Sequence, residues 1–304
     1  MTFVHAAIHV VVVVLLPPLL LGVINKTKAL FAGRVGPPWL QAYHDLGKLL
    51  RKGSVFSRTT TWIFRAGPVV ALITALGAAL IVPLGAHAAP IHFAGDFVLF
   101  AYLLGLGRFF TIAAALDTGS SFEGMGGARE ATFSCLAEPA LFFGLLALAK
   151  ASGSLSLTHM LGTSIAATWG TAGAALVAVT AGFFVVLLAE NSRIPFDDPN
   201  THLELTMIHE VMVLDHGGPL LGLVLYGAAV KLLVFGALVA GVAVPLGALD
   251  PWLAWVVLVG SLFGVAAVIG VVESVMARLR LVQVPSLLLA ACLMSAFGVL
   301  LLVR

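Results

Sequence analysis

Five charged side chains lie within or at the end of stretches of sequence that are otherwise apolar, namely Arg108, Glu138, Glu190, Lys231 and Glu273. A charge at bilayer depth costs at least about 2.5–3.5 kcal/mol on insertion scales, so such residues face one another, a partner or a wet cavity. Two roles fit them. They form ion pairs that lock helices together, or they form a buried acid–base chain that relays protons or ions.

The elements that must hold these charges are membrane helices. The chain has 304 residues, of which 61% are hydrophobic and 10% charged, and its mean hydropathy is +1.10. Soluble domains are roughly 45–50% apolar and about 25% charged. We therefore expect an all-α integral membrane protein, because the strands of a β-barrel would alternate apolar and polar residues. Since a span needs about 20 residues, one membrane domain with about eight transmembrane helices is predicted, over residues 3–24, 66–87, 94–116, 132–151, 165–189, 219–244, 252–273 and 284–303.

Lysine and arginine are concentrated in alternate loops. The first loop, about 25–65, carries eight of them: Lys26, Lys28, Arg34, Lys48, Arg51, Lys52, Arg58 and Arg65. Arg129, Arg193, Arg278 and Arg280 lie in or beside the next three charged loops, whereas the intervening loops are nearly free of basic residues. Because cytoplasmic loops collect basic residues, we expect a multi-pass membrane protein whose long, charged loops face the cytoplasm. Its termini would lie outside, and its first segment would be a membrane helix rather than a cleaved signal.

The first loop also contains an amphipathic helix, predicted over Trp39–Lys52. At about 100° per residue, its polar side chains gather in one arc and its apolar side chains fill the remainder. This pattern is typical of a helix that lies in the membrane interface with a basic face toward water. Such a helix serves as an anchor, or it also receives a partner subunit.

Several other chemistries are excluded or disfavoured. The net charge of +2 gives no reason to expect a nucleic-acid partner, and Cys135 and Cys292 lie in apolar runs without a CxxC pair. No redox metal is therefore expected on this chain. The run Asp117-Thr-Gly-Ser spells an aspartic-protease motif, but the second copy that such chemistry requires does not occur. His202 and His209 resemble fragments of a zinc motif, yet no HExxH occurs.

Three loop segments together resemble a known family. They are 34–50, which begins Arg34-Val-Gly-Pro; 126–138, with Gly-Gly-Ala-Arg129-Glu130 and then Glu138; and 190–205, with Arg193-Ile-Pro-Phe-Asp197 and Glu204-Leu. The chain resembles the membrane subunit shared by respiratory complex I (subunit 1, or H) and membrane-bound group 4 nickel–iron (NiFe) hydrogenases. It looks nearer to the hydrogenase side, which includes formate hydrogenlyase subunit 4 and component C of hydrogenase-4. Its first loop is shorter than in complex I, and Asn200 and His202 stand where complex I proteins are richer in Glu.

The resemblance implies a membrane-anchor and coupling subunit, in a bacterial or archaeal cytoplasmic membrane, that docks a peripheral redox arm and links its chemistry to proton or Na⁺ movement. It implies partner chains: hydrogenase large and small subunits, an iron–sulfur subunit and antiporter-like membrane subunits. Those partners would hold the NiFe centre and the iron–sulfur clusters, and quinone is possible. The expected docking residues are Arg34, Asp45, Arg129, Arg193, Asp197 and Glu204, and the expected ion-path residues are Glu130, Glu138, Glu190, Glu210, Asp215, Lys231 and Glu273.

Three alternatives stay open at this point. The first is that the chain is a subunit of a quinone-reducing complex I-type dehydrogenase. The second is that it is a purely structural anchor without an ion path. An independent secondary transporter is disfavoured, because no second copy of the Arg-Ile-Pro-Phe-Asp segment exists. No catalytic residue or bound cofactor is assigned to this chain.

Overall fold

Every element of secondary structure in the computed structural model, which describes residues 2–197 and 207–303, is a helix. The long helices are α4 (Trp62–Ile81), α5 (Asp96–Asp117), α6 (Ser121–Ser152), α8 (Ser164–Glu190), α9 (Gly218–Ala243), α10 (Pro251–Val275) and α11 (Val284–Val303). The short ones are α1 (Thr2–Leu15), α2 (Pro17–Phe31), α3 (Gln41–Arg51), α7 (Leu157–Met160), η1 (Glu210–Val213), η2 (Leu246–Ala248) and η3 (Leu281–Gln283). In the described residues, seven helices and one bent pair are long and apolar enough to span a membrane, which confirms the all-α membrane fold.

The first predicted span, 3–24, is not one continuous helix. It divides into α1 and α2, which meet at an angle of 50°, and α2 continues to Phe31. The cause is Pro17-Pro18, because proline has no N–H to bond to the carbonyls of the preceding turn. Tyr226 donates a hydrogen bond of 2.9 Å to the Val14 carbonyl, and Tyr43 donates to the Leu15 carbonyl. Two tyrosines thus satisfy carbonyl groups beside the break.

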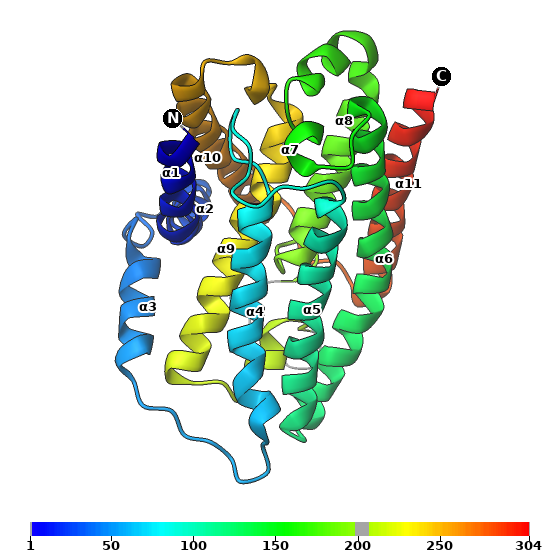
Figure 1. The fold of residues 1–304 in the computed structure, drawn as a ribbon. Helices are drawn as coiled ribbons and strands as arrows, with labels where there is room; N and C mark the ends of the chain where they lie inside the picture. The colour runs from blue at the N-terminus through cyan, green and yellow to red at the C-terminus, as the bar shows by residue number, and fades with distance from the viewer. Residues whose placement is uncertain (1, 198–206, 304) are drawn as a thin grey trace.

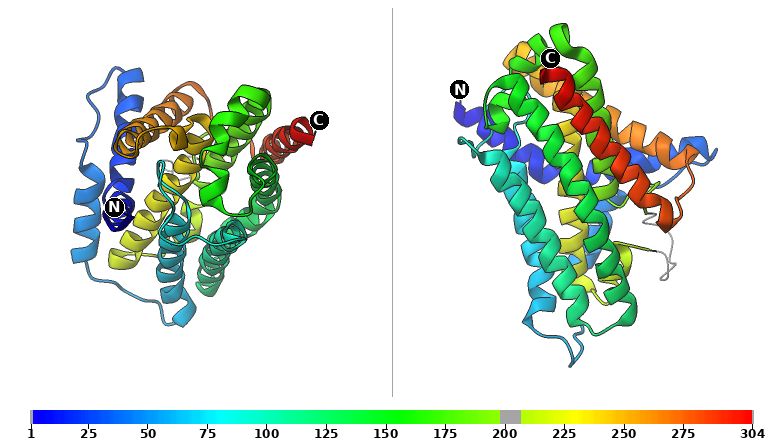
Figure 2. Two further views of the ribbon diagram at one scale, coloured as in Figure 1. Left: turned by 45° about the horizontal axis from the view of Figure 1, so that its top comes forward. Right: turned by 90° about the vertical axis from the view of Figure 1, so that its right-hand side faces the viewer.

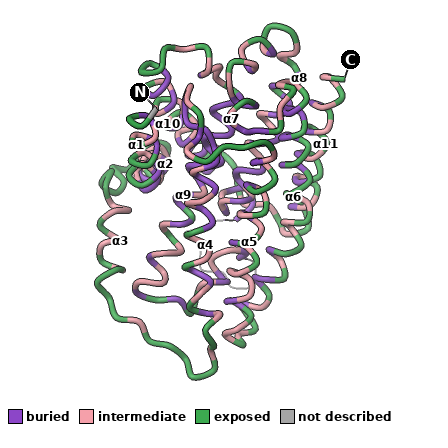
Figure 3. Tube along the Cα trace, in the orientation of Figure 1, coloured by how far each residue is buried: buried purple, intermediate pink, exposed green. Residues whose placement is uncertain are grey.

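Helix α9 lies at the centre of the bundle. It contacts α2, α3, α4, α8 and α10, and most of its apolar length is buried. Helices α4 and α5 form one side, and α6 and α11 pack on each other and on α8. Figure 2 shows α1, α2, α3 and α10 grouped together beside the other long helices. In Figure 3 the buried positions follow α9 and the sides of its neighbours that face it.

Small residues permit the close crossing of α8 and α11. A Cβ atom on Gly182 would lie 2.3 Å from Ser295 Oγ, and one on Gly298 would lie 2.7 Å from Val179 Cγ2. Neither separation leaves room for a side chain, so both positions require glycine at this packing distance. Helix pairs in membranes often use small residues in this way, because lipid provides little hydrophobic drive for their association.

The helices reach unequally toward one end of the molecule. In Figure 1, α4, α5, α6 and α9 extend lower than α10 and α11, away from the end where α1 begins and α11 finishes. We call the lower end the charged end and the opposite one the terminal end. Glu190, the last residue of α8, contacts Arg108, which lies well before the end of α5. The segment that follows α8 is therefore surrounded by longer helices, and Ile194, Pro195, Phe196 and Asp197 are all buried.

One helix boundary near this buried segment differs from the sequence prediction. Helix α6 begins at Ser121 rather than near residue 132, so Arg129 and Glu130 are helical residues and not part of a loop. Its Gly-rich start lacks the apolar character that marked the predicted span. Gly126 nevertheless has no room for a side chain, because a Cβ there would lie 2.3 Å from Val211 Cγ1. Tertiary packing therefore extends this helix beyond its apolar part.

The predicted amphipathic helix is present as α3, slightly shorter than Trp39–Lys52. It lies on the outside of the bundle and contacts α2 and α9. Leu49 and Leu50 face Gly222 of α9, although Leu50 is still mostly exposed, and Lys48 and Arg51 are exposed as well. Part of the apolar face is therefore covered by protein. The location of α3 in a membrane interface remains a prediction.

Candidate functional site: a buried charge network

One arginine gathers three carboxylates from two other helices. Arg108, on α5, places Nη2 2.5 Å from Glu190 Oε1 and Nε 3.3 Å from Glu130 Oε1, and its Nη1 bonds to Glu138. Glu130 and Glu138 both come from α6. A guanidinium carries five N–H donors in a planar fork, so one side chain can serve several carboxylates. These contacts hold α5, α6 and the end of α8 together.

A second cation completes this group from the central helix. Lys231 Nζ, near the middle of α9, lies 2.7 Å from Glu190 Oε2. Glu190 is buried and is the last residue of α8, where the helix dipole already concentrates negative partial charge. Two cations compensate both the carboxylate and the dipole. We call Arg108, Glu130, Glu138, Glu190 and Lys231 the Arg108 cluster.

The chain turns sharply after Glu190, in the segment 191–197. Arg193 N bonds to the Leu188 carbonyl over 2.9 Å, and Ser192 N bonds to the Ala189 carbonyl over 3.2 Å. This is a Schellman arrangement, in which the residue after the cap takes a left-handed conformation. That residue is Ser192, with φ of 52°, rather than the usual glycine. Such backbone strain is tolerated where the surroundings fix the conformation.

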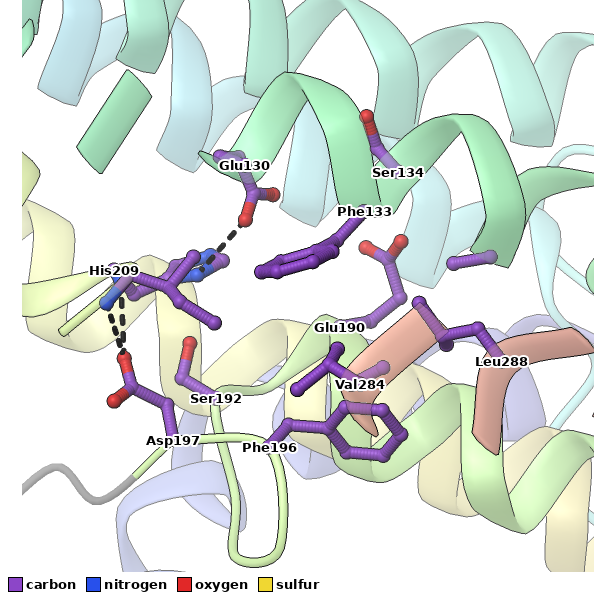
Figure 4. Close-up of a pocket in the computed structure, with 13 residues that line it drawn as sticks. Glu130, Phe133, Ser134, Glu190, Ser192, Phe196, Asp197, His209, Val284 and Leu288 are labelled. Atoms are coloured by element: carbon purple, nitrogen blue, oxygen red, sulfur yellow. Dashed lines mark hydrogen bonds and ion pairs between the residues drawn. The ribbon is translucent and has the colours of Figure 1, made fainter. Parts of the chain in front are cut away.

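Asp197 connects this turn to the segment that precedes α9. Its Oδ2 accepts hydrogen bonds from the backbone N–H groups of Ile208, at 2.9 Å, and His209, at 3.1 Å. Its Oδ1 lies 2.9 Å from Nη2 of Arg278. The His209 ring lies with Nδ1 3.2 Å from Glu130 Oε2 (Figure 4), so the same residue also touches the Arg108 cluster.

A second ion-pair group lies on the other side of the turn. Glu273, on α10, is fully buried and has its Oε2 2.8 Å from Lys28 Nζ of α2. Its Oε1 lies 3.4 Å from Arg193 Nη1. Residues 191–197 therefore contact one charge group through Arg193 and reach the other through Asp197 and His209. A movement of this short turn would change both groups.

The space between the turn and α6 is small. It is lined by Glu130, Phe133, Glu190, Phe196 and His209, among others, and has a volume of about 20 Å³. That volume is sufficient for about one water molecule. In Figure 4 the carboxylates of Glu130 and Glu190 lie on either side of the Phe133 ring. A water molecule here would be a hydrogen-bond partner for groups that do not touch directly.

The structure brings together most, but not all, of the residues selected from the sequence. Of the expected ion-path set, Glu130, Glu138, Glu190 and Lys231 form the Arg108 cluster, and Glu273 lies in the second group. Of the expected docking set, Arg193 and Asp197 hold the turn, and Arg129 donates from Nη1 to the Met207 carbonyl over 2.7 Å.

The remaining selected residues lie elsewhere. Arg34 is exposed after α2, and Asp45 lies on α3, where its Oδ1 accepts a 2.8 Å hydrogen bond from Gln41. Glu210 begins η1, and Asp215 is exposed, with its N–H donated to buried Glu123 over 2.9 Å. Glu204 falls outside the described residues. The structure therefore groups the helix-borne charges more closely than the loop charges.

The residue with the most partners in this network, Arg108, is in neither the expected docking set nor the expected ion-path set. Arg108 stands out in the sequence as a buried charge, but nothing there indicates that it binds three carboxylates. Lys28 and Arg278 look like ordinary loop cations, and His209 resembles a fragment of a zinc motif. Among the described residues, no cluster of three His, Cys, Asp or Glu side chains could hold a metal ion. His209 instead contacts the carboxylate of Glu130 and so belongs to the charge network.

Two other polar residues have structural roles at the charged end. Asp117, from the protease-like motif, accepts hydrogen bonds from Thr61 N at 2.7 Å, Thr61 Oγ1 at 2.8 Å and Phe64 N at 3.2 Å. It thereby caps the start of α4. His216 stacks on Phe64 with ring centroids 4.0 Å apart, and its Nε2 donates to the Phe64 carbonyl over 3.2 Å. Burial lowers the pKa of His216 below its ordinary value, so the neutral ring is favoured there.

Comparison with known proteins gives matches along nearly the whole chain. The family model described as "NADH dehydrogenase" matches residues 4–304. Formate hydrogenlyase subunit 4 of Escherichia coli (strain K12) is 31% identical over 287 residues, which cover 92% of each chain. Hydrogenase-4 component C of the same organism is 32% identical over 244 residues, which cover 80% of this chain and 76% of that protein.

A complex I protein and a solved structure are also similar. The H subunit of the NADH-quinone oxidoreductase of Rubrobacter xylanophilus is 30% identical over 174 residues, or 57% of this chain and 53% of that protein. A chain in the structure of the membrane-bound sulfane sulfur reductase, an archaeal respiratory membrane complex, superposes with a TM-score of 0.83. It is 21% identical and the match covers 99% of each chain, so the two share the same fold.

Proposed function

Because the chain belongs to the NADH dehydrogenase family of membrane subunits, we propose that it is the anchor and coupling subunit of a complex I-like, membrane-bound NiFe hydrogenase of the formate hydrogenlyase type. The hydrogenase branch is supported by the alignment with formate hydrogenlyase subunit 4 over 92% of both chains. The match to the complex I protein covers 57% of this chain. A quinone-reducing complex is therefore the second candidate.

One observation carries the proposal of coupling. The turn 191–197 is bonded to one buried charge group through Arg193 and Glu273. It is linked to the other group through Asp197, which accepts from the backbone of His209, whose ring contacts Glu130. Ion pairs at this depth hold only in one geometry, because each buried charge needs its partner. A displacement of the turn would therefore change the balance of charge around Glu190 and Lys231. This connection supports a role beyond that of a rigid anchor.

In the proposed complex, the charged end faces the cytoplasm and the terminal end faces outward. The basic residues of the 25–65 loop support this orientation. A peripheral redox arm docks over the turn 191–197 and the nearby Arg129. Its hydrogenase large and small subunits and an iron–sulfur subunit hold the NiFe centre and the clusters. In the second candidate, the loops of this chain would instead roof a lipid-facing tunnel for quinone. Antiporter-like subunits lie beside it in the membrane.

The chain's own contribution is to hold or move protons at named groups. Redox chemistry above the turn changes local charge or shifts Asp197 relative to His209. The His209 ring then changes its contact with Glu130, and the Arg108–Glu190–Lys231 arrangement responds. Coupling of this kind requires that both sites bias one element with two positions. The turn 191–197 is that element in this proposal, and the ion moved is H⁺ or Na⁺.

The test is to replace Lys231 by Gln in the purified, membrane-reconstituted complex. We expect hydrogen evolution with an artificial electron donor to continue while ion movement falls to near background, because Glu190 loses one of its two cations. Lys150→Gln is the matched control, since Lys150 is exposed at the other end of α6. Unchanged ion movement in an assembled Lys231→Gln complex would leave the purely structural anchor as the better description. Quinone reduction without a NiFe subunit would instead favour the second candidate.

A further inference from the structure

A groove opens between α5 and α6 on the outer surface of the bundle. Its volume is about 610 Å³, and its lining is mostly apolar, with Tyr102, Leu106, Phe109, Leu141 and Phe142 among the residues. Arg108, Glu138 and Glu190 also line it. The Arg108 cluster is therefore accessible from the side of the helix bundle, through this groove, and not only from the charged end.

Glu138 is the exposed member of the cluster. Its side chain is 49% exposed, whereas those of Arg108, Glu130 and Glu190 are at most 9% exposed. The neighbouring side chains Tyr102 and Phe109 are also well exposed, as expected for a surface that faces apolar surroundings. A carboxylate beside acyl chains is unfavourable. The groove is therefore expected to be covered by something that provides a polar contact to Glu138.

The charges of the cluster indicate the sign of that contact. Its three carboxylates face two permanent cations, Arg108 and Lys231. Glu190 contacts both cations, and Glu130 contacts Arg108 and His209. Glu138 shares Arg108 with the other two carboxylates. The cluster consequently has one more carboxylate than permanent cations, and the least compensated carboxylate is the one in the groove.

The floor of the groove permits close approach of another backbone. Gly105, on α5, lines the groove, and a Cβ atom placed on it would have no atom within 4 Å. Small residues at the surface of a membrane helix let a neighbouring helix pack closely. An anionic lipid headgroup fits less well, because it would add negative charge beside Glu138.

We propose that a transmembrane helix of a neighbouring membrane subunit lies in this groove and places a lysine or arginine opposite Glu138. The inference rests on the proposed function in one respect, that the chain belongs to a multisubunit membrane complex. It adds the location and the chemistry of one contact. The partner's cation would balance the surplus carboxylate, and its apolar residues would cover Tyr102, Phe109 and Phe142.

The test is photo-crosslinking in native membranes, with a benzophenone amino acid placed at Tyr102 or, separately, at Phe142. We expect each probe to form an adduct with one membrane subunit, at an apolar segment that has a Lys or Arg within one helical turn. A probe at Val256 is the positional control, because Val256 is exposed on α10, which does not line the groove. Adducts with lipid alone, or with a helix that has no cation, would overturn the proposal.

Charge variants test the role of Glu138 itself. Glu138→Lys should reduce the groove adduct at least fivefold, and replacing the partner's cation by Glu in the same cells should restore it. Glu138→Gln keeps the side-chain shape and should cause a smaller loss, with helix content and elution volume as checks on folding. An adduct that is unchanged in a folded Glu138→Lys protein would contradict the proposed ion pair.

The same sample separates this inference from the proposed function. Mass spectrometry identifies the subunits that co-purify, independently of the crosslink. A groove adduct in a complex without a NiFe subunit would support the docked helix and overturn the hydrogenase assignment. An intact hydrogenase complex without a protein adduct would support the hydrogenase assignment and overturn the docked helix. A chain that purifies alone and shows no protein adduct would overturn both.

Discussion

The two ends of the molecule join helices that are distant in the sequence through different kinds of contact. At the charged end, the Arg108 cluster joins α5, α6, α8 and α9 through ion pairs. At the terminal end, His5 of α1 stacks on His87 with ring centroids 3.6 Å apart, and Trp255 of α10 donates from Nε1 to His5 Nδ1 over 3.2 Å. Both sets join segments that are far apart in the sequence.

The two ends differ in how much stability is lost when one side chain of the group is removed. We call His5, His87 and Trp255 the ring group. When one of its contacts is lost, apolar surface and one neutral polar atom are left without a partner. In the Arg108 cluster, a missing partner leaves a buried charge, which is much less favourable than a missing neutral hydrogen bond. We therefore expect the charged end to depend on the complete Arg108 cluster, and the terminal end to tolerate single substitutions. The following predictions test this contrast.

The largest effect is expected for Arg108→Met. This change removes the shared cation of three carboxylates and should reduce the free energy of unfolding by about 3–5 kcal/mol, the range found when a buried ion pair loses one partner. Thermal unfolding in detergent, followed by circular dichroism, measures the loss. Arg58→Met is the control, because Arg58 is exposed in the first loop. Equal stability of the two variants would show that the cluster contributes little to folding.

Glu273→Gln should have a smaller effect at the same end. The amide keeps the shape of the side chain but removes the negative charge that faces Lys28 and Arg193. We expect a loss of about 1–3 kcal/mol, the cost of leaving buried polar groups poorly satisfied. Asp250→Asn is the matched control, since Asp250 is exposed and its side chain makes no capping hydrogen bond. If the two amide variants unfold at the same temperature, the second ion-pair group is not stabilising.

The terminal end should respond less to Trp255→Phe. The phenyl ring retains most of the apolar contact but cannot donate to His5, so the expected loss is about 0.5–1.5 kcal/mol. Trp252→Phe provides the comparison, because Trp252 packs beside His5 at a centroid distance of 5.2 Å and is mostly exposed. A loss at Trp255 as large as that of Arg108→Met would contradict the contrast between the two ends.

The smallest effect is a pH dependence of the ring group. Burial lowers the pKa of His87 below its ordinary value of 6.5, against a raising effect of its hydrogen bond to the Pro251 carbonyl. The unfolded chain therefore binds this proton more readily. The stabilising contribution is complete above about pH 6.5 and declines as the pH falls. The unfolding temperature should fall slightly between pH 7 and pH 5, and less so in His87→Phe. His44→Phe, at an exposed position of α3, should behave like the unmodified protein.

Much of the fold follows from the sequence, and the exceptions have local causes. The eight apolar stretches were sufficient to locate the long helices, because a bilayer requires about 20 apolar residues for each span. The division of the first span follows from Pro17-Pro18, a signal that is visible in the sequence but secondary to the apolar run around it. The early start of α6 had no such signal. It depends on Val211 packing against Gly126, and therefore on the position of a distant segment.

The candidate site was predictable in its membership but not in its connections. Charges in or beside apolar stretches are conspicuous, which is why the amino-acid sequence alone singles out Arg108, Glu138, Glu190, Lys231 and Glu273. Hydropathy says nothing about which of them meet. Pairing depends on how far each helix reaches, and α8 ends at a level where Glu190 meets Arg108 and Lys231. Asp45 illustrates the reverse case, since its motif was recognisable but its side chain lies on α3, bonded to Gln41.

The sequence by itself determined that this is an all-helical membrane protein, because its composition and the lengths of its apolar runs suit a bilayer and no aqueous globule. The sequence motifs indicated the family, which the comparisons confirmed. The tertiary structure decided that one guanidinium collects three carboxylates and that the turn 191–197 contacts one charge group directly and the other through His209. These features depend on side chains that are far apart in the sequence. Only the packing of unequal helices around α9 brings them within hydrogen-bond distance.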